Sequence, residues 1–397
     1  MKDHYQVLII GGGTAGISIA ARLADQANPP AMGLIEPSDK HFYQPLWTLV
    51  GGGVFPKEES MRDERDFIPP GVDWIQNRVA SLDPDSNNVT LADGKTIGYD
   101  YLVVTAGIQI DWEAIPGLKE SVGKPGTGVC SNYSYDSVEA TWQNIKEFKG
   151  GTAIFTQPST GIKCAGAPQK IAYLADDHFR RAGVRNKSNI VFASGMGVIF
   201  AVKKYADTLY KVIERKGIKT HFNTELVALR PDKKEAVFTP TGGGDEIVMK
   251  YDMIHVTPRQ SAPDFIKKSK LAGAGGWVEV NQHTTQHTRY ANVFSCGDCS
   301  SLPTSKTGAA IRKQVPVLVE NLVAQMSGQA NSGRYDGYTS CPLVTGYGKL
   351  VLAEFDYDKA PQETFPFDQS QERYSMYAMK AYALPQMYWH GILRGRA

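Results

Sequence analysis

The sequence contains no long hydrophobic segment. Among its 397 residues, no apolar run reaches the roughly 18 to 20 residues that a helix needs to span a bilayer, because charges and Pro385 interrupt even the apolar C-terminal tail. Met1 is followed by a strand-like stretch, and not by a charged region, an apolar region and a cleavage site. We therefore expect neither an integral membrane helix nor a secretory signal.

The sequence is also poor in cysteine and nearly balanced in charge. Its five cysteines are too few for a disulfide-stapled scaffold, and a chain of this length does not need one. A formal net charge of +2 gives no basic surface of the kind that drives nucleic-acid binding. With 42% hydrophobic and 21% charged residues, the composition indicates a folded multidomain enzyme whose cysteines serve chemistry.

A glycine-rich turn near the N-terminus predicts nucleotide binding. The apolar stretch YQVLII predicts a strand, ISIAARLADQ a helix and GLIEP a second strand, which together make a βαβ unit. Between the first strand and the helix, Gly11, Gly13 and Gly16 form the G-x-G-x-x-G pattern, so that backbone amides and the helix dipole meet a pyrophosphate. Glu36 ends the second strand and predicts hydrogen bonds to a ribose without a 2′-phosphate.

A second unit of the same kind begins near residue 150. GGTAIFTQP predicts a strand, APQKIAYLADDHFRRAG a helix, and the segment 189–217 another strand and helix. Its glycine turn reads Gly195-Met196-Gly197, with Phe200 where a third glycine would allow close helix packing and phosphate approach. We expect a Rossmann-like domain without a functional NAD site.

Two later segments identify the first nucleotide by resemblance. YDYLVVTAG (99–107) and ANVFSCGDCSSLPTSKT (291–307) resemble segments of flavoproteins with two dinucleotide-binding domains, in which Gly297 and Asp298 would lie along an FAD. The expected fold is therefore α/β, with two Rossmann-like domains and a C-terminal membrane-interface segment. The expected boundaries are 1–125 with 290–335 for the FAD domain, 126–289 for the second domain and 336–397 for the C-terminal region.

One thiol, Cys164, stands before a predicted helix. Lys163 and the helix N-terminus favour its thiolate, so we prefer a redox role over a buried inert cysteine. Its partner must come from elsewhere in the chain, and Cys341, which Pro342 restrains to an extended conformation, is the best choice. Cys296 and Cys299 have C-x-x-C spacing, but they enclose Gly297-Asp298 and no second half completes a metal site, so we expect them to be structural and expect no metal.

The C-terminal tail is aromatic and basic. A helix from Tyr374 to Tyr382 and a short segment beyond Pro385 would carry apolar faces with cations near their ends. The apolar side chains are Met376, Met379, Met387, Tyr388, Trp389, Ile392 and Leu393. This pattern predicts a membrane-interface segment; the alternatives are packing on the protein's own core or a dimer seam.

Over nearly its whole length the chain resembles the sulfide:quinone oxidoreductases, specifically the branch with the mitochondrial enzymes. The resemblance is carried by FYQPLWTLVGGG, CSNYSYDSVE, KCAGAPQKIAYL, GDCSSLPTSKTGAA, YDGYTSCPLVTGYGKLVLAEFDYD and the tail. It implies a redox pair of Cys164 and Cys341 and a dispensable Cys130. It also implies FAD contacts at Ala15, Gly16, Glu36, Gln44, Val79, Asp298 and Lys306. The end at Ala397, where mitochondrial relatives continue, predicts a weaker membrane affinity.

The resemblance also implies the reaction. Hydrogen sulfide would attack a disulfide between the two cysteines, the electrons would pass through FAD to a ubiquinone-type quinone, and a small acceptor would remove the sulfane sulfur from Cys341. A type II NADH:quinone dehydrogenase and a flavin-containing binding protein without turnover are the alternatives. We expect peripheral attachment to the cytoplasmic face of a bacterial inner membrane, or to the mitochondrial inner membrane if a transit peptide was removed. A homo-oligomer is compatible with this interpretation.

Overall fold

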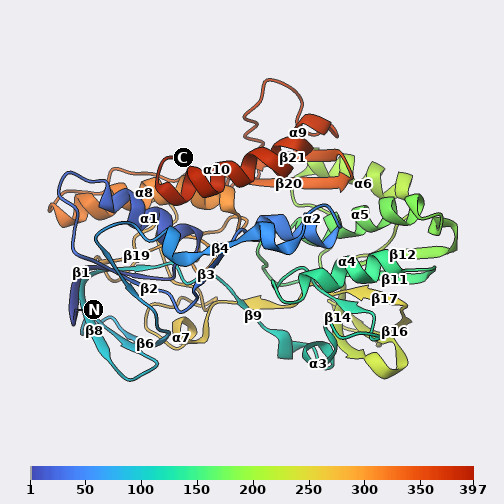
Figure 1. Cartoon of the computed structure of the whole chain (residues 1–397), viewed down its shortest axis with the longest axis horizontal. Coiled ribbons are helices and arrows are strands. Elements are labelled where there is room, and N and C mark those ends of the chain that lie inside the picture. Colours follow the sequence, from blue (N-terminus) through green and yellow to red (C-terminus); the bar gives the residue numbers. More distant parts are fainter. Residues whose placement is uncertain (1) are drawn as a thin grey trace.

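Two β-sheets, a mixed one and a wholly parallel one, form the body of the protein together with the helices that pack on them (Figure 1). The computed structural model describes residues 2–397. The first sheet has the order β5-β2-β1-β8-β7-β6, with β19 paired to the C-terminal half of β8. Its strands are β1 (His4–Ile10), β2 (Met32–Ile35), β5 (Val72–Ile75), β6 (Val79–Asp83), β7 (Asn88–Leu91), β8 (Thr96–Val104) and β19 (Val293–Ser295). The apolar runs of β1, β2 and the second half of β8 are buried, as is typical of central parallel strands that are covered on both faces.

Helices α1 (Thr14–Ala24) and α8 (Gly308–Met326) lie side by side on this sheet (Figure 1). Strand β19 pairs with β8 and helix α8 packs on α1, so the segment from 291 to 326 is part of the first unit. About 180 residues, nearly half of the chain, lie between the two parts of this unit. The return of the chain to this unit brings the predicted Gly297-Asp298 segment to the G-x-G-x-x-G turn of Gly11, Gly13 and Gly16, which we call the fingerprint.

The second sheet is wholly parallel, in the order β10-β17-β11-β12-β13. Its strands are β10 (Val129–Cys130), β11 (Gly151–Gln157), β12 (Ser188–Ser194), β13 (Lys219–His221) and β17 (Met253–His255). It is flanked by α4 (Val138–Glu147), α5 (Ala167–Arg181) and α6 (Lys203–Lys216). An antiparallel ladder of β14 (Thr224–Arg230), β15 (Glu235–Pro240) and β16 (Ile247–Lys250) is inserted between β13 and β17. The predicted α/β fold with two Rossmann-like units is confirmed.

Short elements join the two units. Strands β9 (Gln109–Ile110) and β18 (Gln260–Ser261) pair antiparallel where the chain leaves the first unit and returns to it. The remaining short elements are β3 (Lys40–Phe42), α2 (Trp47–Gly51), β4 (Met61–Asp63), α3 (Leu118–Ser121) and α7 (Asp264–Lys267). Helix α2 packs on α4 and α5, so the first unit also contacts the helices of the second.

The C-terminal region adds a hairpin and a long helical tail. Strands β20 (Thr339–Gly346) and β21 (Lys349–Phe355) pair antiparallel, and β20 packs on α5. The tail then runs through α9 (Tyr374–Ala378), a π-helical turn (Met379–Ala383) and α10 (Leu384–His390) to a short 3₁₀ turn (Ile392–Arg394). Figure 1 shows this tail lying across both units, from the hairpin to α1.

The expectation of two tail segments separated at Pro385 is wrong. The helical run continues through Pro385, which occupies the first turn of α10 where a missing N–H is tolerated, and the π-helical turn before it absorbs the change in hydrogen bonding. Tyr388, Trp389 and Leu393 are buried against the protein, whereas Tyr374 and Tyr382 are 70% and 59% exposed. Packing on the protein's own core therefore holds for the second half of the tail. Among residues 2–397, no helix is both long and apolar enough to cross a membrane.

Candidate active site

The fold brings Cys164 and Cys341 together across 177 positions of sequence. Their sulfur atoms lie 3.8 Å apart as free thiols. Cys164 follows β11 and precedes α5, while Cys341 lies in β20, and the packing of β20 on α5 sets the distance between them. Two thiols at this separation can close to a disulfide with a small movement.

The backbone around Cys164 is held in an uncommon conformation. Cys164 has φ +53°, a left-handed value that costs a non-glycine residue roughly 1 to 3 kcal/mol. Its N–H donates to the carbonyl of Lys306 at 2.8 Å, and its own carbonyl accepts from Ala167. Gly166 gives the two thiols room, because a Cβ at this position would lie 2.4 Å from Cδ2 of Leu343 and 2.7 Å from the sulfur of Cys341. The strained turn thus presents one sulfur to the other.

Two buried lysines face the thiols. The ammonium of Lys170 lies 3.2 Å from the sulfur of Cys164, one turn into α5, and Lys170 is 2% exposed. The hydrogen bond from Cys341, and after it the charge of Lys170, hold the pKa of Cys164 well below its usual range against the effect of burial, and Lys380 of the tail adds to this. The thiolate in turn raises the pKa of Cys341 well above its usual range. The pair is therefore polarised, with the negative charge on Cys164.

The sequence interpretation named Lys163 as the lysine that stabilises the Cys164 thiolate, and this is wrong. The ammonium of Lys163 donates to the side chain of Gln44 at 2.7 Å and lies over the ring of Trp47, and does not contact the sulfur of Cys164. Lys170 and Lys380 were missed. A lysine on the apolar face of a predicted helix was the available signal for Lys170, whereas nothing in the sequence relates Lys380 to a thiol 216 positions away. Burial, together with repulsion from Lys170, lowers the pKa of Lys380 to about 8.

The glycine fingerprint fits a bound dinucleotide. Gly11 has φ +98°, and a Cβ there would lie 2.5 Å from the carbonyl oxygen of Thr105. A Cβ at Gly16 would lie 1.8 Å from the carbonyl oxygen of Gly11, so this glycine lets α1 pack on β1. Gly13, by contrast, faces open space with no atom within 4 Å of where its Cβ would be, and Ala15 follows it, buried, in the first turn of α1. The turn therefore leaves room for a phosphate at the N-terminus of α1.

Glu36, the residue predicted to bind a ribose, lies beside the glycine turn. Its carboxylate accepts hydrogen bonds from the N–H groups of Gly12 and Ser38, both at 2.8 Å, and so points at the fingerprint turn. The N–H of Glu36 donates to Ile75, the last residue of β5, and Val79 begins β6 just after it. Val79 thus lies four residues beyond the strand end to which Glu36 is hydrogen-bonded.

The segment from Gly297 to Lys306 connects the fingerprint to Cys164. Gly297 has φ +74°, and its Cα lies near the side chain of Ala15. Lys306 donates to the carbonyl oxygens of Asp298 and Ser300 at 2.6 and 3.1 Å, and its own carbonyl accepts from Cys164. Burial raises the pKa of Asp298. The structure thus places Lys306 next to Cys164, Asp298 next to Lys306, and Gly297 next to Ala15 of the glycine turn. Gln44 is joined to Lys163, the residue before Cys164.

The other cysteines lie in unreactive surroundings. Cys130 is fully buried in β10, and burial raises its pKa to about 12. Cys296 and Cys299 are fully buried, burial raises the pKa of both, and the thiol of Cys299 donates to the carbonyl of Val104 at 3.3 Å. These three side chains fill the core.

The second glycine turn is occupied by a carboxylate. Glu225 accepts from the N–H of Ser159 at 2.7 Å and pairs with Arg259, and a Cβ at Gly195 would lie 2.2 Å from its oxygen. Helix α6 begins only at Lys203, so its N-terminus does not follow directly on the glycines. A buried negative charge stands where a pyrophosphate would approach this turn.

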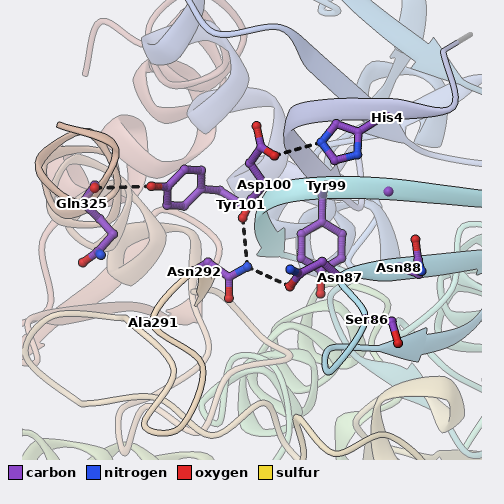
Figure 2. Close-up of a pocket in the computed structure, with 11 residues that line it drawn as sticks. His4, Ser86, Asn87, Asn88, Tyr99, Asp100, Tyr101, Ala291, Asn292 and Gln325 are labelled. Carbon is purple, nitrogen blue, oxygen red and sulfur yellow. Dashed lines mark hydrogen bonds and ion pairs between the residues drawn. The ribbon is translucent and has the colours of Figure 1, made fainter. Parts of the chain in front are cut away.

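A polar depression at the edge of the first sheet is separate from these residues (Figure 2). It has a volume of about 660 Å³, and hydrogen bonds such as His4 to Asp100 and Asn292 to Asn87 brace its walls. None of the predicted site residues lines it. The candidate active site is therefore the thiol pair with the fingerprint.

Comparison with known proteins gives the class and then the family. The model of the pyridine nucleotide-disulphide oxidoreductase family matches residues 5–148 and 159–325, so the chain belongs to this class of flavin-dependent oxidoreductases. It is 50% identical to the mitochondrial sulfide:quinone oxidoreductase of Mus musculus, covering 99% of this chain and 87% of that protein. The relative of the same name from Dictyostelium discoideum is 48% identical, covering 100% and 87%. The chain belongs to the sulfide:quinone oxidoreductase family.

A solved structure agrees on the fold. The sulfide:quinone oxidoreductase of the hyperthermophilic bacterium Aquifex aeolicus superposes with a TM-score of 0.84 at 18% identity, covering 100% of this chain and 92% of that one. The family resemblance seen in the sequence is confirmed, and the comparisons favour it over the type II NADH:quinone dehydrogenase alternative.

Proposed function

We propose that the protein oxidises hydrogen sulfide at Cys164 and Cys341 and passes two electrons to a membrane quinone of the ubiquinone type. The observation that carries this proposal is the 3.8 Å separation of the two sulfur atoms with Lys170 beside one of them. In the oxidised protein the pair is a disulfide. Hydrosulfide attacks Cys341, the bond between the two cysteines breaks, and the sulfide sulfur stays on Cys341 as a persulfide while Cys164 leaves as a thiolate.

The polarisation of the pair supports this direction of attack. A thiol with a low pKa leaves a disulfide faster, and the charge of Lys170 holds the pKa of Cys164 down. A small thiophilic acceptor such as sulfite, glutathione or cyanide then takes the sulfane sulfur from Cys341. Because Cys341 is only 2% exposed, such an acceptor must be small enough to enter a buried site.

The cofactor that fits the fingerprint is FAD, which would supply a two-electron carrier between the thiolate and the quinone. We propose that Gly11, Gly13, Ala15 and Gly16 receive its pyrophosphate and that Glu36 and Val79 lie at its adenosine. Gln44, Gly297, Asp298 and Lys306 would hold the end nearest Cys164. The hydrogen bond from Cys164 to the Lys306 carbonyl supports this assignment, because it links the cofactor segment to the reactive thiol.

We also propose a separate role for each of the three regions of the chain. We assign FAD binding to 1–125 with 290–335, and a second domain without NAD binding to 126–289. The carboxylate of Glu225 at the second glycine turn supports the latter, since it already occupies the N–H of Ser159 and the space beside Gly195. The region 336–397 supplies Cys341 and the membrane contact.

The membrane contact we assign to the exposed side of the tail. Tyr374 and Tyr382 are exposed there, and a cavity of about 340 Å³ near the end of α10 is lined by Arg62, Trp389, His390 and Arg394, with Asp66 as its single acidic residue. Exposed tyrosines and guanidinium groups are side chains that suit contact with lipid headgroups. The relatives at 48–50% identity are mitochondrial proteins, so we favour peripheral attachment in mitochondria. Those relatives give no support to the bacterial inner-membrane expectation.

Anaerobic stopped-flow absorbance tests the function. After mixing with sulfide, the flavin absorbance of the purified protein should fall during the stopped-flow time course. Cys164→Ser should abolish this loss of absorbance while the flavin stays bound. NADH should leave the spectrum unchanged. Bleaching by NADH and not by sulfide would refute the proposal in favour of a dehydrogenase.

A further inference from the structure

A buried chain of hydrogen bonds joins the C-terminal tail to the glycine fingerprint. The hydroxyl of Tyr388 in α10 lies 2.9 Å from the hydroxyl of Thr14 and 2.6 Å from Nε2 of His41. Nδ1 of His41 lies 2.8 Å from Oε2 of Glu64. The side chains of His41 and Glu64 are both only 2% exposed. The chain therefore runs from the tail, through the interior, to the turn between β1 and α1.

One arrangement of protons satisfies every contact in this chain. Thr14 donates to Tyr388, Tyr388 donates to His41 and Nδ1 of His41 donates to Glu64. Aromatic packing fixes the same side chains, since the ring of Tyr388 lies 4.5 Å from that of Tyr43 and the ring of His41 lies 5.8 Å from that of Trp389. The loss of the Tyr388 hydroxyl would leave Nε2 of buried His41 and the hydroxyl of half-buried Thr14 without this partner.

The hydrogen-bond chain ends at Glu64, which has an oxygen without a hydrogen-bond partner beside the fingerprint. Oε1 of Glu64 is buried and has no hydrogen-bond partner among the described residues. A Cβ on Gly12 would lie 2.3 Å from this oxygen and 2.7 Å from the side chain of Glu36, so the two carboxylates flank the same glycine. Burial raises the pKa of Glu64, as expected for a carboxyl that lacks solvent. A buried acceptor without a partner needs a donor, and a ribose hydroxyl beside Glu36 would be one.

We propose that Glu64 is a second ribose-binding carboxylate of the FAD site, and that Tyr388 of the tail holds it in position through His41. Docking of α10 and retention of FAD then stabilise each other. The proposal rests on FAD binding at the fingerprint, as assigned above.

The packing of the tail supports this coupling. Beyond α10, the 3₁₀ turn packs on α1, and the side chain of Arg22 in α1 donates to the carbonyl of Ala397 at 3.1 Å. The tail thus contacts the helix whose N-terminus receives the pyrophosphate. Because linkage is reciprocal, a contact through which the tail tightens FAD binding must also let FAD tighten tail docking.

The first test compares two variants that each lose one buried hydroxyl. Tyr388→Phe keeps the ring and removes the link, whereas Tyr205→Phe removes a hydroxyl that donates to the carbonyl of Glu354, outside the site. We expect Tyr388→Phe to release FAD roughly 5- to 20-fold faster, the effect of one or two lost hydrogen bonds, and Tyr205→Phe to release it at the wild-type rate. Release is followed by the rise of free-flavin fluorescence.

A double-mutant cycle separates positioning from general loosening. Glu64→Gln should also speed FAD release, and adding Tyr388→Phe to it should give little further effect, because both act through one chain. Hydrogen exchange gives a readout independent of flavin chemistry. In the wild type, removal of FAD should speed exchange in residues 384–394, and in Tyr388→Phe exchange should be fast with or without FAD.

Equal FAD release by wild type, Tyr388→Phe and Glu64→Gln would overturn the proposal, and so would additive effects in the cycle. Tail exchange that is independent of FAD would overturn the coupling. A purified protein that never binds FAD would refute the cofactor assignment itself. FAD that is bound but not reduced by sulfide would refute the proposed function and leave the role of Glu64 standing.

Discussion

Replacing Lys170 by Gln removes the positive charge next to Cys164 at nearly constant volume. The Coulomb attraction across 3.2 Å is about 5 kcal/mol at an effective dielectric constant near 20. Most of it is offset by the cost of burying the charges, and a hydrogen bond to a charged group retains about 1.5 to 3 kcal/mol. The variant should therefore hold roughly 10- to 100-fold less thiolate at Cys164 at a pH where the thiol form predominates.

The sign of the pH dependence follows from the direction of the shift. In the wild type the pKa of Cys164 lies well below the usual value, so its thiolate persists as the pH falls below that value and is lost only as the pH passes through the lowered pKa. Without Lys170 the pKa rises, and the thiolate is lost at a higher pH. Any folding stability from the lowered pKa is, likewise, present above the unfolded pKa and lost as the pH falls through the folded one.

The assay is alkylation of the reduced protein by iodoacetamide as a function of pH, with the modified cysteine identified by mass spectrometry. Lys170→Gln should shift the rise of Cys164 alkylation to higher pH and slow flavin bleaching by sulfide. Lys170→Arg, which keeps the charge, should restore much of both, and Lys203→Gln, at an exposed lysine paired with Asp207, is the control. An unchanged alkylation profile in Lys170→Gln would show that Lys170 does not stabilise the thiolate.

The remaining predictions concern the thiols and the tail. Cys341→Ser should abolish sulfide-dependent quinone reduction without loss of flavin, and activity in a variant lacking both cysteines would end the disulfide proposal. Cys130→Ser should keep most of the activity, because this thiol is buried with a pKa of about 12, and a complete loss of turnover would contradict that assignment. Gly166→Ala should slow sulfide oxidation and lower the free energy of unfolding by about 1 to 3 kcal/mol, since its Cβ would meet the sulfur of Cys341, and wild-type values in both assays would refute this. Replacing Tyr374 and Tyr382 by Ser should weaken sedimentation with liposomes without unfolding the protein, because both side chains are exposed, and undiminished sedimentation would place the membrane contact elsewhere.

The sequence by itself determined the features that depend on local order. The fingerprint needs a strand, a tight turn and a helix start in consecutive residues, so Gly11, Gly13, Gly16 and Glu36 could be read directly from YQVLIIGGGTAG and GLIEP. The altered turn at Gly195 was readable for the same reason. The choice of Cys341 as partner of Cys164 came from the chemistry of thiols and from family resemblance, and not from any local pattern.

Only the tertiary structure decided which charged groups meet. Lys163 is adjacent to Cys164 in sequence, yet the left-handed turn directs its ammonium to Gln44, while α5 carries Lys170 to the sulfur. The tail is a second example, because an amphipathic pattern predicts contact with a lipid surface and packing on the protein equally well. Its second half buries Tyr388 because His41 and Thr14, more than 300 positions earlier, offer hydrogen-bond partners to that hydroxyl. Periodicity records which face of a helix is apolar, whereas the identity of the covering surface depends on contacts between residues far apart in the chain.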